Sequence, residues 1–210
     1  MPHVAALAAV WLLACGFMWK FVLLGLIPLN SDWVSFSFEP WRSSLAPRPP
    51  CNPELDDPAL NQFPLRTTAF RILARGGIPL WNPDILCGTP LLADSVALPF
   101  DVLSLPFFLS LSPPVAHGMT ILCQVGFAGT GMYLFLTSLG LGWFAGLLGA
   151  TTYMFNGTAV VWLEYSFFNG AFVWAPFALF GLSAMRTGRT RLGGMVFPVS
   201  VGLQIGRAHV

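Results

Sequence analysis

Long apolar stretches at both ends of the chain flank a polar, proline-rich middle. The first stretch, Val4–Leu29, is 26 residues long, and Lys20 is its only charged residue. A helix needs about 20 residues to cross the hydrocarbon core of a bilayer. A signal peptide would instead have a basic start and a shorter apolar stretch. We therefore predict that residues 1–29 form a retained transmembrane helix.

Three further apolar segments are long enough to cross a membrane. They are Val115–Leu136, Trp143–Leu163 and Phe167–Met185. A shorter segment, residues 98–112, contains Asp101 and two prolines. Its length favours an interfacial or re-entrant segment over a full crossing. Residues 192–204 are predicted to begin a further helix.

Small residues recur within the predicted spans. Gly142, Gly146 and Ala150 follow one another at intervals of four, and Gly126, Gly129 and Gly131 form a second patch. Such spacing predicts faces on which helix backbones approach closely. The alternative is that glycine is simply common in membrane helices.

Composition supports a membrane protein. The chain is 55% hydrophobic and 9% charged, with a mean hydropathy of +0.70, whereas an average globular domain has roughly 25% charged residues. This apolar content excludes a disordered chain, and a net charge of +1 argues against nucleic-acid binding. We predict an all-α, polytopic transmembrane protein of unknown oligomeric state, surrounded by membrane lipid.

The distribution of charge predicts the topology. Three arginines lie together in the sequence RTGRTR, residues 186–191, and positive residues prefer the cytoplasm. Counting back through three spans places residues 30–97 outside and the amino terminus inside. Eight of the nine acidic residues lie in or next to this outer region, between Asp32 and Asp101. Residues 113–191 then hold three transmembrane helices and a cytoplasmic basic loop.

The last six residues have an unusual sequence. IGRAHV, residues 205–210, can be encoded by ATC GGA AGA GCA CAC GTC, and this DNA begins a widely used short-read sequencing adapter. We therefore expect these residues to be translated adapter and the protein to continue beyond Gln204. The alternative is a genuine short tail.

The outer loop contains the residue types that a transferase needs. Asp57 before Pro58 is typical of a helix start, and Gly76-Gly77 of a helix end, so we predict an amphipathic helix over residues 58–75. Arg71 and Arg75 share one face of it, with Arg66 to the side. Guanidinium groups could bind a phosphate, and a carboxylate of Asp32, Asp56 or Asp57 could take a proton from an acceptor. The alternative is a solvated helix face.

Metal and disulfide chemistry have weaker support. The Asp56–Asp57 pair could bind a divalent cation, although Asp57 competes as a helix cap, and the scattered histidines do not suggest a metal site. No resident cofactor is predicted. Cys51 and Cys87 share the outer side and could pair, whereas Cys15 and Cys123 are expected to be packing residues.

The order of several motifs resembles the bacterial YfhO-like membrane proteins. The resemblance runs through DDPALNQFPLRTTAFRILARGGIPLWNPDILCGTPLLADS, LPFDVLSLPFF, AGTGMYLFLTSLGL and GATTYMFNGTAVVW. It covers roughly residues 30–185. The segment LPFDVLSLP departs from the family pattern, which usually has an aromatic-proline motif at this point.

The resemblance implies a GT-C-like membrane glycosyltransferase in the bacterial cytoplasmic membrane. Such a protein moves a sugar from a polyprenyl-phosphate donor to a cell-envelope acceptor. Asp32 or the Asp56–Asp57 pair would then be the catalytic base. The residues implied to bind substrate are Gln62, Arg66, Arg71, Arg75, Trp81 and Asn82. The alternative is a transporter or an envelope-assembly scaffold without catalysis, which predicts sensitivity at Lys20, His117 or Gln124.

Overall fold

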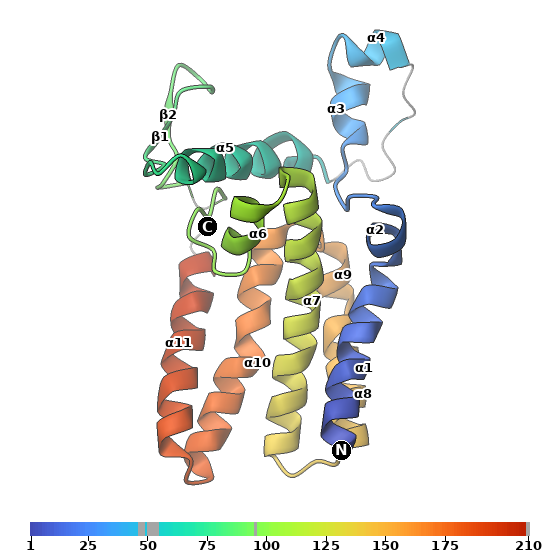
Figure 1. Ribbon diagram of the computed structural model, residues 1–210, viewed down its shortest axis with the longest axis vertical. Coiled ribbons are helices and arrows are strands. Elements are labelled where there is room, and N and C mark those ends of the chain that lie inside the picture. Colours follow the sequence, from blue (N-terminus) through green and yellow to red (C-terminus); the bar gives the residue numbers. More distant parts are fainter. Residues whose placement is uncertain (46–48, 50–54, 95, 209–210) are drawn as a thin grey trace. The chain divides into compact units, whose positions relative to one another are not determined.

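The computed structural model confirms the all-α prediction. It is 69% helix and 2% strand (Figure 1). The structure describes residues 1–45, 49, 55–94 and 96–208. The chain divides into two compact units, one formed by Met1–Leu26 with Thr120–Val210 and the other by Ile27–Met119.

The first unit consists of long helices that run alongside one another and of the short helices α2 and α9 (Figure 1). They are α1 (Pro2–Phe17), α2 (Trp19–Leu24), most of α7 (Pro113–Ser138), α8 (Trp143–Met154), α9 (Gly157–Val161), α10 (Ser166–Arg186) and α11 (Thr190–Ala208). Among the described residues, α7 is the one helix that is both long and apolar enough to cross a membrane. The apolar helix Pro2–Phe17 and the apolar part of α10, Phe172–Arg186, are shorter.

The prediction of one continuous helix over Val4–Leu29 is wrong. The helix is interrupted at Met18, whose backbone (φ −89°, ψ 25°) separates α1 from α2. Helix α2 then ends at Gly25, which adopts a left-handed conformation with φ 66°. Glycine lacks a Cβ and takes this conformation without steric cost. Lys20 is exposed on α2, and its Nζ lies 6.0 Å from the centroid of the Trp19 ring.

The prediction of one continuous helix over Trp143–Leu163 is also wrong, because α8 and α9 are separate. Asn156 lies between them, and its Oδ1 accepts the N–H of Ala159 at 3.0 Å. Its Nδ2 donates to the Tyr153 carbonyl at 2.7 Å. An asparagine side chain that bonds to nearby backbone groups in this way ends one helix and caps the next.

The buried faces of α1 and α8 consist mostly of small residues, and large apolar side chains of the same helices are exposed. Helix α1 buries Ala6, Val10 and Ala14 while Leu12 and Leu23 of the α1–α2 segment stay exposed. Helix α8 follows the same rule, since it buries Gly146, Ala150 and Met154 and exposes Phe144 and Leu148. The helices can therefore approach closely.

Glycine contacts confirm most of the predicted small-residue faces. A Cβ added at Gly126 would lie 2.6 Å from Cζ3 of Trp11, and one at Gly146 would lie 3.1 Å from Cε2 of Tyr133. Gly142 has nothing within 4 Å, so the prediction is wrong there.

Helices α10 and α11 form a closely packed hairpin. Helix α10 matches the predicted segment Phe167–Met185, and α11 includes the predicted start at residues 192–204. A Cβ added at Gly181 would lie 2.7 Å from the backbone nitrogen of Phe197. One added at Gly193 would overlap the Gly181 carbonyl. The two backbones are in direct contact because both positions are glycine.

The second unit consists of short elements. They are α3 (Asp32–Ser37), α4 (Trp41–Leu45), the π-helical turn η1 (Pro58–Gln62), α5 (Phe63–Ala74), β1 (Trp81–Asn82), β2 (Thr89–Pro90), α6 (Leu105–Ser110) and the first turns of α7. The strands pair antiparallel, with Trp81 opposite Pro90. Helix α6 has six residues, too few to cross a membrane, as predicted from the length of residues 98–112.

The predicted helix over residues 58–75 is confirmed as η1 followed by α5. Arg75 ends it, and Gly76 has φ 77° as expected for a helix end. The predicted cap is wrong, because the Asp57 side chain makes no capping hydrogen bond. The backbone carbonyl of Asp56 accepts the N–H of Ala59 and of Leu60 instead, at 3.1 and 3.0 Å.

Candidate functional site

Helix α5 separates the predicted arginines onto two faces. Arg66 is buried, together with Leu65, Ala69 and Phe70, which pack into the interior of the second unit. Arg71 and Arg75 are exposed. The sequence predicted Arg66 to lie to the side of the other two, and the structure places it in the core.

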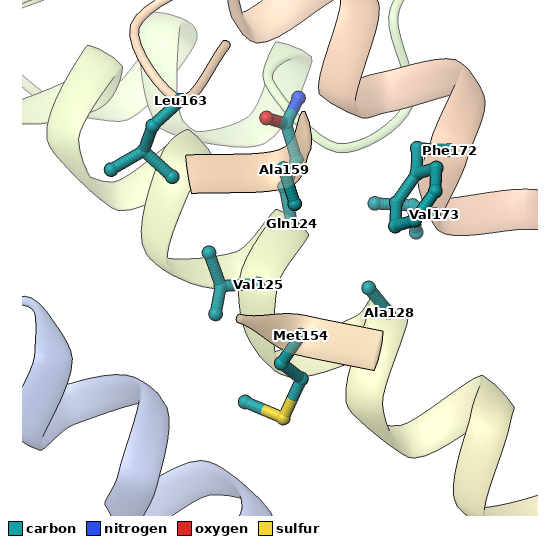
Figure 2. A pocket seen from close by; sticks show the side chains of 8 residues that line it. All are labelled: Gln124, Val125, Ala128, Met154, Ala159, Leu163, Phe172 and Val173. Carbon is teal, nitrogen blue, oxygen red and sulfur yellow. The ribbon is translucent and has the colours of Figure 1, made fainter. Parts of the chain in front are cut away.

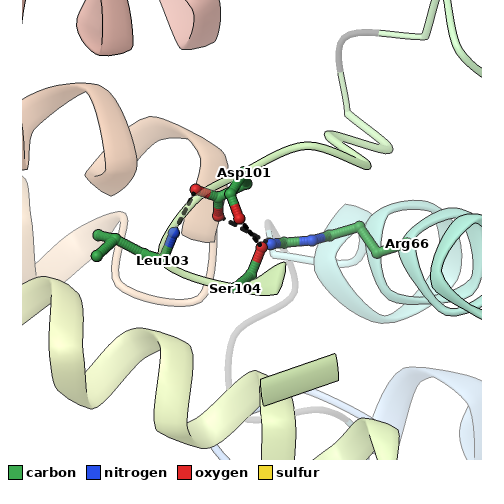
Figure 3. A network of polar contacts seen from close by, with 4 residues as sticks. All are labelled: Arg66, Asp101, Leu103 and Ser104. Carbon is green, nitrogen blue, oxygen red and sulfur yellow. Dashed lines mark hydrogen bonds and ion pairs between the residues drawn. The ribbon is translucent and has the colours of Figure 1, made fainter. Parts of the chain in front are cut away.

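Arg66 forms a buried ion pair with Asp101 (Figure 3). Nη2 of Arg66 lies 3.3 Å from Oδ2 of Asp101, and both side chains are 1% exposed. Oδ1 of Asp101 accepts the N–H of Leu103 at 3.1 Å. Ser104 donates its hydroxyl to the Asp101 carbonyl at 3.3 Å. The carboxylate is held on both oxygens, so its position is fixed.

An aromatic ring lies over this guanidinium. Cζ of Arg66 lies 5.4 Å from the centroid of the Phe108 ring, and Phe108 stacks on Phe70 with centroids 4.5 Å apart. Burial lowers the pKa of Arg66 to about 10, because the charged form loses its hydration. Arg66 remains charged near neutral pH and is a structural residue of this core.

Two further polar side chains are buried in the second unit. Gln62 is buried, and its Oε1 has no hydrogen-bond partner among the described residues. His117 is also buried, with its ring 5.7 Å from that of Phe63 in an edge-to-face arrangement. The Pro28 carbonyl is close to the imidazole without meeting hydrogen-bond geometry.

An open groove lies on the other face of α5. Its volume is about 420 Å³. The residues that line it are Phe63, Pro64, Thr67, Thr68, Arg71, Asn82, Asp84 and Ile85. They come from α5 and from β1 with the loop that follows it. Two of the predicted substrate-binding residues, Arg71 and Asn82, are therefore brought together here.

Asp84 organises the charged side of this groove. Its Oδ2 lies 3.1 Å from Nη2 of Arg71, and the two side chains are 61% and 51% exposed. The same Nη2 is 3.4 Å from Oγ1 of Thr68. Oδ1 of Asn82 accepts the backbone N–H of Asp84 at 3.0 Å, which positions the loop. The Arg71 guanidinium is therefore accessible to solvent, and its contacts with Asp84 and Thr68 hold it in place.

The loop after β1 has an unusual backbone. Leu86, Cys87 and Gly88 all have positive φ, at 50°, 63° and 114°. A Cβ added at Gly88 would lie 2.6 Å from Cζ2 of Trp81, so the indole packs directly on the glycine backbone. Trp81 is otherwise exposed. The resemblance pointed to Trp81 and Asn82, and the structure gives both a structural role in this loop.

The predicted catalytic aspartates do not line the groove. Asp32 is exposed at the start of α3, Asp57 is exposed before η1, and Asp56 is partly buried next to it. Arg75 is exposed at the end of α5 and is not a lining residue either.

Sequence reasoning missed Asp84 and Asp101 as partners of the arginines. Asp84 follows a predicted turn. The signal for Asp101 was its place within an apolar segment, since an acid there requires a partner.

A small cavity in the first unit offers little room. It is lined by Gln124, Val125, Ala128, Met154, Ala159, Leu163, Phe172 and Val173 (Figure 2). Its volume is about 10 Å³, which is the space of one water molecule. Gln124 is the polar residue among mostly apolar neighbours, and the cavity is too small for a substrate.

Among the described residues, no cluster of three histidine, cysteine or acidic side chains could hold a metal ion. Cys51 lies outside the described residues, so its pairing with Cys87 stays a prediction. Cys15 and Cys123 are partly buried in α1 and α7. In comparisons with known proteins, no protein-family model, no curated protein and no solved structure matches this chain.

Proposed function

We propose that this chain is a polytopic membrane protein of GT-C-like type, and that it uses the α5 groove to bind the phosphate of a polyprenyl-phosphate sugar donor. The observation that carries the proposal is the accessible guanidinium of Arg71 in an open groove with Thr68, Asn82 and Asp84. The acceptor is a component of the bacterial cell envelope, and the protein lies in the cytoplasmic membrane.

Placement in a membrane is supported by the first unit. Helix α7 has 26 residues and the required hydropathy, and it is about 39 Å long at 1.5 Å per residue. The exposed large apolar side chains of α1 and α8, such as Leu12, Phe144 and Leu148, would be unfavourable in water. In lipid they lie against acyl chains while small residues pack inside.

Phosphate binding is supported by the chemistry of the groove. A guanidinium carries five N–H donors in a fixed plane, so Arg71 can keep its contact with Asp84 while other N–H groups bind a phosphate oxygen. The hydroxyls of Thr67 and Thr68 line the same groove. The apolar side chains of Phe63 and Ile85 provide a surface for the first isoprene unit.

A carboxylate in the same groove suggests the proton acceptor. Asp84 lies beside the proposed phosphate site, and it joins Asp32, Asp56 and Asp57 as a candidate base. Substituting each aspartate singly by asparagine and measuring sugar transfer in membranes assigns the role. Full transfer by all four variants would contradict base catalysis from this loop.

Binding of a defined probe tests the phosphate site directly. Farnesyl phosphate is titrated against the purified full chain, with isothermal titration calorimetry as the readout. Arg71→Gln is expected to weaken binding about tenfold or more, since charge-assisted hydrogen bonds contribute about 1.5–3 kcal/mol. Arg75→Gln, one helical turn away and outside the groove, is the matched control. Equal effects of the two substitutions would contradict the proposal.

The alternative function, a transporter or scaffold without catalysis, is favoured by one observation. Helix α7 buries His117, Thr120 and Gln124 at helical spacing along one face. Buried polar residues in membrane helices often mark substrate pathways. His117→Ala that abolishes cellular function, with every loop aspartate variant active, would support this alternative.

A further inference from the structure

A second open cavity lies at the opposite end of α7 from His117. It has a volume of about 660 Å³ and lies between the ends of α7 and α10, within the first unit. Its walls include the apolar side chains of Phe135, Leu139, Leu179 and Leu182. This space is large enough for part of a lipid molecule, in contrast to the water-sized cavity beside Gln124.

Polar groups occupy one edge of the cavity. Oγ of Ser138 lies 2.7 Å from Oγ of Ser183, and each hydroxyl is also within hydrogen-bond distance of a backbone carbonyl of α7. Arg186, in the last turn of α10, also lines the cavity and is exposed. No described carboxylate lies within ion-pair distance of Arg186. Apolar walls with one cationic edge are the arrangement that a phospholipid requires.

The surroundings of Arg186 are strongly basic. Arg189 follows in the turn and Arg191 at the start of α11, and both line a second open cavity of about 410 Å³. The sequence after Asp101 contains one acidic residue, Glu164, which precedes the first residue of α10. The 21 residues of α10 separate Glu164 from the turn between α10 and α11 by about 30 Å at 1.5 Å per residue. That distance exceeds the Debye length of about 8 Å, so Glu164 does not neutralise the three exposed arginines.

We propose that this cavity binds one anionic phospholipid, with its phosphate at Arg186 and an acyl chain between Leu139 and Leu179. Basic pockets between membrane helices are suited to acidic lipid headgroups. Anionic lipid then anchors the α10–α11 turn at its membrane surface. The inference rests on the membrane placement proposed above and is independent of sugar transfer.

Native mass spectrometry of the purified full chain tests this proposal. Phosphatidylglycerol and phosphatidylcholine with identical acyl chains are titrated separately. We expect one tightly bound phosphatidylglycerol, and roughly fivefold weaker binding for Arg186→Gln, as expected for removing one basic residue at a lipid surface. Lys20→Gln, which removes an exposed cation from α2, is the matched control and should bind as the wild type does.

A second variant tests the apolar part of the site. Leu179 is 41% exposed, so Leu179→Trp should fold and fill the cavity while keeping every charge. It is expected to lose the bound lipid. Three results would each overturn the proposal. The two lipids could bind equally, or the Arg186 and Lys20 variants could lose binding equally. The chain could also form a dimer that excludes lipid and dissociates in Leu179→Trp. Release of the chain from membranes by alkaline carbonate would refute the membrane placement itself, whereas loss of farnesyl phosphate binding concerns only the α5 groove.

Discussion

The second unit contains a buried and an exposed ion pair, so one type of substitution can test how burial changes the contribution of an ion pair to stability. Asp101→Asn and Asp84→Asn each remove a negative charge while keeping nearly the same side-chain shape. Asp101 pairs with Arg66 where both side chains are 1% exposed, and Asp84 pairs with Arg71 where they are 61% and 51% exposed. The chemistry is the same, and the surroundings differ.

The expected magnitudes follow from desolvation. Burial lowers the pKa of Arg66 to about 10, so the charged form of this side chain is disfavoured in the folded protein. Removing the partner charge leaves this cation uncompensated, which costs about 3–5 kcal/mol of the free energy of unfolding. The exposed pair is worth about 0–1 kcal/mol. Asp101→Asn should therefore be the far more destabilising change.

Thermal and denaturant unfolding of the full chain in detergent, followed by tryptophan fluorescence, measures both variants. In Asp101→Asn the loss should become smaller as pH rises from 6 to 8.5, because removal of the partner carboxylate lowers the pKa of Arg66 further and the folded variant can then release that proton. In the wild type no such change is expected over this range. Arg66 releases its proton more readily in the folded protein than in the unfolded chain, so its effect on stability changes only as pH rises through about 10. Arg66→Met combined with Asp101→Leu should recover most of the loss, because an apolar pair carries no desolvation cost. Equal stability of the two single variants would refute the argument from burial.

Three further predictions concern backbone and packing. Gly193→Ala should cost about 1–3 kcal/mol because the new methyl overlaps the facing helix, whereas Gly202→Ala, with nothing within 4 Å, should be neutral or stabilising in thermal unfolding. Asn156→Ala removes the cap of α9 and should cost about 1 kcal/mol, and unchanged stability would contradict the capping role. Gly88→Ala should displace the Trp81 indole and destabilise the folded conformation of the loop by more than about 1 kcal/mol. A near-ultraviolet circular dichroism spectrum identical to wild type would contradict this last prediction.

The helical class and most of the helices are predictable from the sequence, because hydrophobic pattern and turn residues are local signals. The helix of residues 58–75 and its end at Gly76 follow from proline and glycine at its two ends. The breaks at Met18 and Asn156 were missed. An apolar run carries little information about where its backbone hydrogen bonds are interrupted, and Asn156 acts through a side-chain bond that only the folded backbone makes possible.

Which charged side chains form ion pairs depends on the tertiary structure. Helical spacing grouped Arg71 with Arg75 and set Arg66 aside, but no local pattern could select Asp101, 35 residues away, as the partner of Arg66. The same holds for Arg71 and Asp84, since the turn at Gly76, where φ is 77°, and strand β1 lead the chain from the end of α5 to Asp84. The groove consequently contains one of the three predicted arginines. Pairing between distant residues depends on how the chain closes its loops, and hydrophobic periodicity does not encode that closure.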